Sequence, residues 1–365
     1  MLERIALTFV SGLTCRRIRQ LLEIVNSPEE LYRCSRSQLS EIFGKHTSII
    51  DAIINKTTFA RAEEELRFME KHHIRPLFYT DNDYPQRLNQ PDCEDTPPLL
   101  YYLGNADLNS QRVVSIVGTR KATEYGKSLT QKLVEGLKGE GVLVVSGLAY
   151  GIDTAAHINA VSSDIPTVGV VAHGLDQLYP TQNRKLATEM ARNGGGILTE
   201  YPSQTRIQTS YFPARNRIIA ALADAVVVVE ASETGGALIT ANLANGYNRE
   251  VMAFPGRVGD IYSAGTNRII HTNKASLITS ANDLIELMNW ERRSAPQSAI
   301  QTTLPLNMTA DQTRIHRLLS DNESLPIEEI MHQLDLSMPK IATALLDMEL
   351  KGICKCLPGK RYRLL

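Results

Sequence analysis

The sequence lacks a long apolar run. Nothing in it approaches the ~20 apolar residues that a membrane-spanning helix needs. The first seven residues, Met1 to Leu7, contain neither a basic region followed by an apolar stretch nor a small-residue cleavage site. We therefore expect a cytoplasmic protein without a membrane segment.

The sequence also lacks an excess of charge of either sign. Its 365 residues carry a net charge of −1, and the sequence pI is near 6.7. Bulk positive charge is thus excluded as a way to bind a polyanion, and a nucleic-acid role requires a local cluster of basic residues. With 43% hydrophobic and 22% charged residues, the chain is typical of a globular protein and is long enough for two or three domains.

Cysteine is scarce and scattered. The chain has five: Cys15, Cys34, Cys93, Cys354 and Cys356. The last two alternate as in a strand, and no second pair follows at the spacing of a zinc site. We expect the cysteines to be packing residues and predict no metal site.

Two common nucleotide-binding loops are missing. The Gly126-Lys127 pair follows Gly118 after seven residues, whereas a P-loop needs four. No Gly-x-Gly-x-x-Gly follows the first apolar run, so an NAD-type pyrophosphate site is not indicated. We predict no cofactor.

Residues 111–290 alternate short apolar runs with helical patterns. The runs have few polar interruptions, which is typical of strands covered on both faces. They span residues 113–117, 142–145, 167–171, 196–199, 225–229 and 251–254. Between them, Leu129, Leu133 and Leu137 repeat at helical spacing behind a cap at Thr123. The pattern predicts an α/β fold with a Rossmann-like, doubly wound, mostly parallel sheet.

The chain before this domain has two parts. Residues 1–75 predict several short helices, an N-terminal domain of SAM or helix-hairpin-helix type, and Ser27 followed by Pro28 marks one helix start. Residues 11–17 form either a plain turn, which we favour, or a hairpin that contacts a nucleic-acid backbone. Residues 76–110 predict a connector packed on the core, with a short strand at 99–103.

The chain after this domain begins with a predicted linker at 291–305 and ends in a winged-helix domain at 306–365. The third helix of that domain is expected at 339–351. Its inward residues are Ile341, Ala344, Leu345 and Met348. Its other face includes Asp347 and Glu349, which do not suit phosphates. We therefore favour a protein-contact or weak-binding role over sequence-specific duplex recognition.

The most distinctive segment for function is residues 202–223, which contain no Asp or Glu. The basic and aromatic residues that gather there are Arg206, Tyr211, Phe212, Arg215 and Arg217. Cations beside flat rings suit a flexible polyanion whose bases can stack. For Arg217, the alternative is a buried structural residue paired with a distant carboxylate.

Glycine turns follow four of the predicted strands. They are Gly118-Thr119-Arg120, the loop from Gly147 to Gly151, His173-Gly174, and Gly235-Gly236. Glycine lets the backbone approach a phosphate closely, and open α/β sheets bind ligands at this edge. We predict that these turns and the basic segment form one anion-binding groove.

Asp153 and His157 lie four residues apart on a predicted helix. They could carry acid–base or metal chemistry, but a third partner is missing nearby. A histidine capped by its helical neighbour is the favoured interpretation. We predict no catalytic residues and no enzymatic activity.

Many of these motifs occur, in the same order, in a known family. They are Gly118-Thr119-Arg120 with Thr123 and Tyr125-Gly126, residues 146–157, Asp176 with Tyr179-Pro180 and Asn183, and residues 199–202, 212–220, 229–231 and 255–256. The central domain thereby resembles the DprA (Smf) DNA-processing family throughout its length. The N-terminal helical region and the winged-helix pattern are similar to the longer members more loosely.

The resemblance implies a protein that binds single-stranded DNA and loads the RecA recombinase onto it, notably in natural transformation. It also implies no established catalytic activity and a homodimer formed through the Rossmann-like domain. Arg120, Arg206 and Phe212 match family positions associated with the DNA groove. At position 206 many relatives carry lysine, and at Ile207 they often carry proline.

The complete predicted site for single-stranded DNA combines the turns with the basic segment. It comprises Gly118, Thr119, Arg120, Gly147, Gly151, Arg206, Tyr211, Phe212, Arg215, Asn216, Arg217, Gly235 and Gly236. Two other classes of function remain as alternatives. One is a nucleotide N-glycosidase similar to the Rossmann-like phosphoribohydrolases, although their Pro-Gly-Gly-x-Gly-Thr loop is absent. The other is a sensor of small nucleotides.

Overall fold

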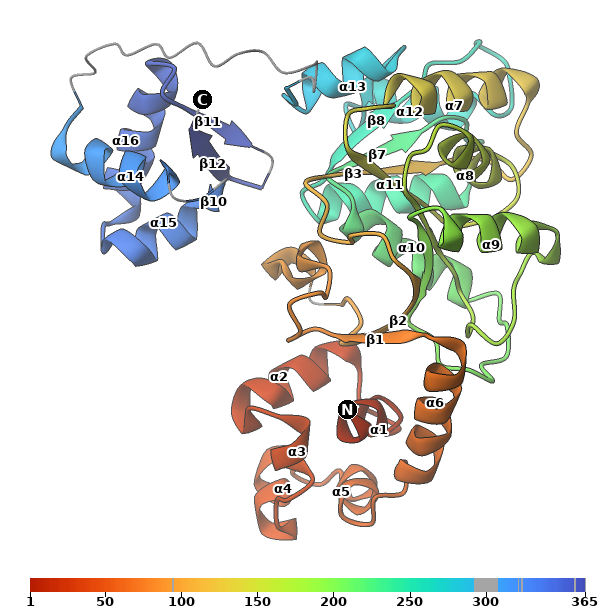
Figure 1. Ribbon diagram of the computed structural model, residues 1–365, viewed down its shortest axis with the longest axis vertical. Coiled ribbons are helices and arrows are strands. Elements are labelled where there is room, and N and C mark those ends of the chain that lie inside the picture. Colours follow the sequence, from red (N-terminus) through yellow and green to blue (C-terminus); the bar gives the residue numbers. More distant parts are fainter. Residues whose placement is uncertain (94, 292–307, 321, 323, 358, 365) are drawn as a thin grey trace. The chain divides into compact units, whose positions relative to one another are not determined.

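The computed structural model describes residues 1–93, 95–291, 308–320, 322, 324–357 and 359–364 (Figure 1). The chain divides into two compact units, Met1–Ala281 and Asn282–Leu365. The linker predicted at 291–305 lies outside the described residues except for Glu291.

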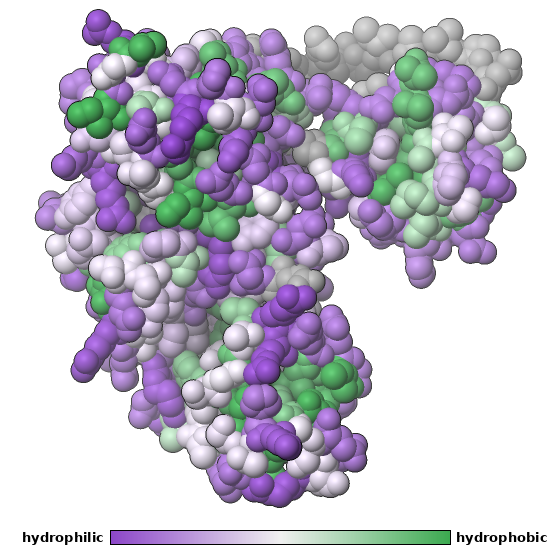
Figure 2. Space-filling view, turned by 180° about the vertical axis from the view of Figure 1, so that it is seen from behind, coloured by the Kyte–Doolittle hydropathy of each residue, from purple (hydrophilic) through white to green (hydrophobic). Residues whose placement is uncertain are grey.

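None of the helices in these ranges combines the length and apolar character required to span a bilayer. On the face shown in Figure 2, polar residues cover most of the surface and apolar residues gather in separate patches.

A sheet of nine strands forms the centre of the first unit, in the order β1-β2-β6-β5-β4-β3-β7-β8-β9. The strands from β6 to β9 in that order are parallel. They are β3 (Arg112–Val117), β4 (Val142–Ser146), β5 (Thr167–Val170), β6 (Gly196–Thr199), β7 (Ala225–Val228), β8 (Glu250–Ala253) and β9 (Ser276–Leu277). The six predicted strands are confirmed, each to within one residue at either end.

The order of the sheet reverses at β3. Val114 on β3 pairs with Val144 on β4 on one side and with Ala225 on β7 on the other. The chain therefore runs outward from β3 in one direction through β4, β5 and β6, and in the other through β7 and β8. Such a switch point is where open α/β sheets leave a crevice at the carboxyl ends of their strands.

Two antiparallel strands extend the sheet beyond β6. They are β1 (Arg75–Phe78) and β2 (Leu99–Gly104), and β2 pairs with β6 through Tyr102 and Leu198. The short 3-10 helices η1 (Gln86–Asn89) and η2 (Pro91–Cys93) lie between them in the chain. The predicted connector is thus more than a segment packed on the core, because its backbone continues the sheet.

Helices cover both faces of this sheet (Figure 1). On one face α7 (Glu124–Gly136), α8 (Ile152–Ser162) and α9 (Arg184–Arg192) follow one another, and on the other α10 (Tyr211–Leu222) packs against α11 (Gly236–Gly246). The helix α12 (Ala264–His271) follows β8, and the 3-10 helix η3 (Thr181–Asn183) precedes α9. The hydroxyl of Thr123 accepts from the N–H of Gly126 and so caps α7 as predicted.

The N-terminal region is helical, as predicted. Its helices are α1 (Leu2–Thr8), α2 (Cys15–Val25), α3 (Pro28–Leu31), α4 (Arg36–Phe43), α5 (Thr47–Ile54) and α6 (Phe59–His72). Ser27 caps α3 by accepting from the N–H of Glu30. On α6, the carboxylate of the buried Glu65 accepts from the N–H of Ser203 at 2.9 Å, which ties this region to the loop between β6 and α10.

The second unit contains a winged-helix fold. Its elements after α13 (Ala281–Leu287), which begins at the unit boundary, are α14 (Ala310–Ser320), β10 (Leu325–Pro326), α15 (Ile327–Leu334), α16 (Met338–Leu350), β11 (Cys354–Leu357) and β12 (Arg361–Leu364). The strands form a sheet in the order β10-β12-β11. The four inward positions predicted for α16 are buried.

The two acidic side chains of α16 are occupied within the winged-helix fold. Asp347 accepts from the side chains of Gln312 and Lys351, and Glu349 accepts from the N–H of Cys356 at 3.0 Å. The same helix exposes Leu346 and Leu350. Carboxylates and exposed apolar side chains on this helix agree poorly with binding in a major groove.

Candidate nucleic-acid interface

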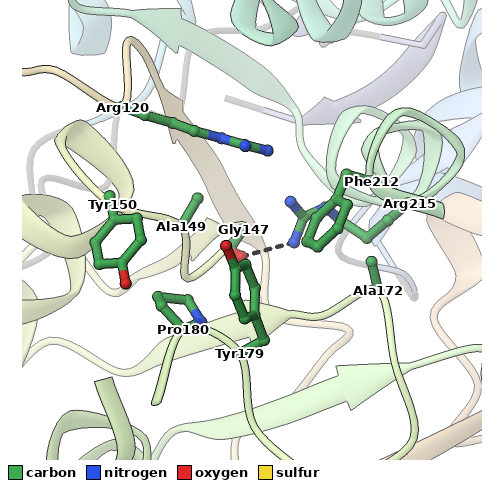
Figure 3. A pocket seen from close by; sticks show the side chains of 9 residues that line it. All are labelled: Arg120, Gly147, Ala149, Tyr150, Ala172, Tyr179, Pro180, Phe212 and Arg215. Carbon is green, nitrogen blue, oxygen red and sulfur yellow. Dashed lines mark hydrogen bonds between the residues drawn. The ribbon is translucent and has the colours of Figure 1, made fainter. Parts of the chain in front are cut away.

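A small pocket opens at the carboxyl edge of the sheet, beside the switch point (Figure 3). Four parts of the chain converge there: the turns after β3, β4 and β5 and the first turns of α10. The lining residues are Arg120, Gly147, Ala149, Tyr150, Ala172, Tyr179, Pro180, Phe212 and Arg215. The convergence brings the predicted Gly-Thr-Arg turn and the predicted basic segment together.

Arg120 and Phe212 contact each other in this pocket. The guanidinium carbon of Arg120 lies 5.4 Å from the centre of the Phe212 ring, a cation–π distance. The Tyr179 ring meets Phe212 edge-on, with the ring centres 5.7 Å apart. The Arg120 side chain is exposed to solvent. The pocket therefore presents a cation and two aromatic rings to a ligand.

Two family models match the sequence. The model described as DNA recombination-mediator protein A matches residues 75–289, and that of the DprA winged helix domain matches residues 293–360. The chain belongs to the DNA recombination-mediator protein A (DprA/Smf) family. The first match covers more than half of the chain and contains every residue of the pocket.

Relatives and solved structures extend the likeness over nearly the whole chain. Protein Smf of Synechocystis sp. is 32% identical over 97% of this chain and 95% of its own length. DprA of Streptococcus pneumoniae is 40% identical over 56% of this chain and 71% of its own length.

Two relatives with solved structures share the fold. The X-ray structure of the S. pneumoniae DprA has a TM-score of 0.68 and 32% identity, covering 78% of this chain and 97% of that one. A Helicobacter pylori DprA structure, which concerns the single-stranded DNA binding mode of that protein, has a TM-score of 0.53 and 31% identity over 59% of this chain and 95% of that one.

In this DprA-family chain, Arg215 has a structural role that the sequence does not predict. Its side chain is 4% exposed, and Nη1 donates to the carbonyl oxygens of Gly147, at 2.6 Å, and Val170. Burial lowers the pKa of Arg215 to about 10, although the nearby Asp153 carboxylate opposes that shift. The guanidinium is therefore charged at neutral pH and joins the ends of β4 and β5 instead of reaching into solvent for phosphate.

Arg217 is also held inside the protein. Its guanidinium forms a bidentate ion pair with Glu200, in which Nη2 lies 2.6 Å from Oε2. Nε donates a separate hydrogen bond to the backbone carbonyl of Asp95 at 3.0 Å. Burial acts to lower the pKa of Arg217, but the hydrogen bond that Arg217 donates to the Glu200 carboxylate outweighs burial, and the net shift of the pKa is upward. The alternative of a structural arginine paired with a carboxylate therefore describes Arg217 better than phosphate contact does.

Two further residues of the α10 segment contact protein partners. Tyr211 stacks on Tyr201, with the ring centres 4.4 Å apart and the planes 24° apart. Asn216 donates from Nδ2 to the carbonyl of Gly236 at 3.3 Å, linking α10 to the first residue of α11. Phe212 lines the pocket beside Arg120 and Tyr211 does not, which makes Phe212 the better candidate for base stacking.

Arg206 lies apart from the pocket lining. It is exposed on the loop between β6 and α10, in the segment that precedes Tyr211. Burial of Ser203 and its hydrogen bonds to Glu65 and Arg61 fix the start of this loop. The structure thus supports Arg206 as a solvent-facing cation and does not place it among the residues around Phe212.

The strand-end glycines differ in what they do. At Gly118, Gly147 and Gly151 an added Cβ would lie within 2.6 Å of a neighbouring atom. The backbone N–H of Gly147 already donates to Asp153, and that of Thr119 donates to the carbonyl of Glu230. These three glycines therefore allow loops to pack closely, and the N–H groups of Gly147 and Thr119 are already used within the protein. At Gly235 and Gly236 an added Cβ would make only ordinary van der Waals contacts, at 3.6 Å and 3.7 Å.

A matched pair of substitutions tests this difference. Gly151 has φ of +81°, and its Cβ would lie 2.2 Å from the Thr119 carbonyl oxygen, whereas a Cβ on Gly235 meets nothing closer than 3.6 Å. Gly151→Ala is expected to lower the free energy of unfolding by about 2 kcal/mol or more, and Gly235→Ala by less than about 0.5 kcal/mol. Urea unfolding measures both. Equal losses of unfolding free energy in the two variants would contradict the packing role of Gly151.

Asp153 and His157 do not form the pair that their spacing permits. His157 Nδ1 lies 2.7 Å from the hydroxyl of Thr167 on β5, so the favoured cap by a helical neighbour is wrong. Burial lowers the pKa of His157 to about 3, which keeps the ring neutral. Burial raises the pKa of Asp153, with Arg215 acting against the rise. No hydrogen bond joins the two side chains in the described part of the chain, and neither lines the pocket.

Metal ligation has no candidate among residues 1–93, 95–291, 308–320 and the remaining described positions. No group of three His, Cys, Asp or Glu side chains in these ranges is placed to hold a metal ion. Cys93 and Cys354 are buried, in agreement with a packing role.

The predicted site omits several residues that the structure brings to the pocket. Tyr150, Tyr179 and Pro180 line it, and the Tyr150 hydroxyl donates to the Gln182 side chain at 2.6 Å. Tyr150 lies inside a predicted glycine turn, and Tyr179-Pro180 belongs to a motif that carries the family resemblance. Their position in loops that follow strands could have predicted their place in the pocket, because all such loops lie at one edge of the sheet.

Proposed function

We propose that this protein binds single-stranded DNA at the carboxyl edge of its sheet and loads the RecA recombinase onto the strand, as in natural transformation and recombination. The observation that carries the proposal is the exposed Arg120 guanidinium over the Phe212 ring, beside Tyr179. Family membership and the single-stranded DNA described for the H. pylori relative support it.

The physical basis is an exchange of partners. Arg120 covers a face of Phe212 in the free protein. A phosphate attracts the guanidinium more strongly than a neutral ring does, because the hydrogen bonds are charge-assisted. Movement of Arg120 toward phosphate leaves the Phe212 ring for a base, and base stacking contributes ~1–3 kcal/mol. Bases in a duplex are already stacked, so the site favours single strands.

The proposal includes no chemical step. Asp153 and His157 follow the pocket residue Tyr150 in the chain; the Asp153 carboxylate accepts from the N–H of Gly147, and Nδ1 of His157 is hydrogen-bonded to Thr167. RecA contact, a homodimer formed through the Rossmann-like domain, and a cytoplasmic location belong to the proposal through the family resemblance. The two alternatives against which it is tested are cleavage of the N-glycosidic bond of a nucleotide and sensing of a small nucleotide.

A comparison of oligo-dT with duplex of the same length tests the function. We expect oligo-dT to bind more tightly, with an affinity that falls as salt rises. Incubation with nucleoside monophosphates is expected to release no free base. Preferential duplex binding, or displacement of oligo-dT by a small nucleotide at equal concentration, would contradict the proposal.

Phe212→Leu separates stacking from charge. It is expected to weaken oligo-dT binding by about 5- to 150-fold, the equivalent of ~1–3 kcal/mol of stacking, with the salt dependence kept. Phe212→Tyr, which retains a ring, serves as the matched control and is expected to bind within a few-fold of the parent. Equal effects for both variants would show that the ring does not stack on a base.

A further inference from the structure

A second hollow lies at the other side of the loop that follows β5. Its apolar floor comes from β2, that loop, α9 and β6, and consists of Leu103, Leu175, Leu178, Ala187, Ala191 and Ile197. Its volume is about 410 Å³. None of these residues lines the Arg120 pocket.

The helix α9 makes the hollow. Ala187 and Ala191 are one turn apart on the same face of the helix, and their small side chains leave the floor uncovered. Larger residues at these two positions would fill the space. The hollow is therefore a direct product of the sequence of α9.

The rim carries more positive than negative charge. Arg184 and Arg192 lie on α9 at either end of the alanine pair. They are eight positions apart in the helix, which corresponds to a rise of about 12 Å along its axis. Both are exposed, and neither guanidinium has a hydrogen-bond or ion-pair partner among the described residues. The one acidic lining residue is Asp176. The ionic groups that line the hollow thus have a net charge of +1, from two arginines and one aspartate.

We propose that this hollow binds a small amphiphilic anion: a flat apolar body that rests on the floor, with one sulfonate-, carboxylate- or phosphate-type group held by Arg184 or Arg192. Ligand pockets of ~300–1,000 Å³ with apolar linings and a few convergent polar groups are of this kind. A neutral apolar ligand would leave both arginines without an anionic partner. A hydrophilic anion would bury no apolar surface against the floor of the hollow. The inference does not depend on DNA binding.

Two fluorescent probes of nearly the same shape test the site. 8-Anilinonaphthalene-1-sulfonate carries the anion, and N-phenyl-1-naphthylamine lacks it. The full chain is expected to bind the sulfonate at one saturable site, about tenfold more tightly than the neutral amine, a ratio that corresponds to one charge-assisted contact. Fluorescence that rises without saturation, or equal affinity for the two probes, would overturn the proposal.

Variants locate the probe. The double substitution Arg184→Ala/Arg192→Ala is expected to reduce sulfonate affinity about tenfold and leave the neutral probe unchanged, whereas Lys185→Ala, an exposed cation on the same helix, changes neither. Ala191→Phe is expected to abolish binding of both probes. If Ala191→Phe lowers the thermal unfolding midpoint, the test rests on the double-arginine variant alone, because its two substituted side chains are exposed.

The Arg120 pocket provides the remaining control, because Tyr179 and Pro180 of that pocket adjoin Leu178 in the chain. Arg120→Ala is expected to leave sulfonate binding unchanged. Weaker sulfonate binding in Arg120→Ala, with no change in the double-arginine variant, would place the probe in the Arg120 pocket and refute a second site.

Discussion

Arg120→Ala is expected to weaken oligo-dT binding by about 10- to 100-fold. The guanidinium is exposed beside Phe212, and no ion pair in the described residues uses its charge. A charge-assisted hydrogen bond contributes ~1.5–3 kcal/mol, which gives the range of affinity. The slope of log affinity against log salt is expected to become shallower by about 0.7 for each phosphate that the variant no longer neutralises.

Fluorescence anisotropy at several salt concentrations measures both quantities. Lys121→Ala, which removes an adjacent exposed cation from the same turn, is the matched control and is expected to have a much smaller effect. Arg120→Lys keeps the charge and is expected to keep the salt slope while losing part of the affinity. If Lys121→Ala weakens binding as much as Arg120→Ala, general positive charge and not this pocket explains binding.

Arg215→Leu is expected to lower the free energy of unfolding by about 3–5 kcal/mol at pH 7, the usual cost of removing one partner from a buried ionic arrangement. The substitution leaves the carbonyls of Gly147 and Val170 without their donor. It also leaves Asp153 buried without the positive charge that opposes its upward pKa shift. Urea unfolding of parent and variant measures the difference.

The destabilisation by Arg215→Leu is expected to depend on pH. Burial raises the folded-state pKa of Asp153, and without Arg215 that pKa rises further. A carboxyl whose pKa is higher in the folded state costs nothing below its unfolded pKa of about 4, and the cost grows until the pH passes the folded value. The variant is therefore expected to lose less stability at pH 4 than at pH 7.

A double variant checks that Asp153 is the cause. Adding Asp153→Asn to Arg215→Leu removes the buried charge and is expected to reduce the pH dependence and restore part of the stability at pH 7. The account of Arg215 would be wrong if Arg215→Leu cost less than about 1 kcal/mol, or if its cost were the same at both pH values in the presence of Asp153.

The strands of the core could be predicted because each is a short apolar run covered on both faces. The edge that holds the pocket followed from the same pattern, since turns after parallel strands share one side of the sheet. The membership of β1 and β2 in the sheet could not be predicted in this way. The sequence of β2 (Leu99–Gly104) is apolar, but it does not indicate which strand β2 pairs with. Its partner, β6, lies almost a hundred residues later in the chain.

The roles of the arginines were the hardest to predict. Local charge marks residues 202–223 as basic, yet the partners of Arg215 are backbone carbonyls 68 and 45 residues away, and Arg217 pairs with a glutamate just outside the window. Backbone carbonyls carry no sequence signature. Arg120 was predictable as an exposed cation because a turn after a strand leaves a long side chain at the surface.

Photo-crosslinking tests the location of the strand most directly. Oligo-dT that contains 5-iododeoxyuridine forms adducts with aromatic side chains that it contacts, and peptide mapping identifies them. The adducts are expected on Phe212 and on Tyr179 or Tyr150, and Arg120→Ala is expected to reduce their yield. Adducts confined to residues 1–75 or to the winged-helix unit, with none at these rings, would contradict binding at the edge of the sheet.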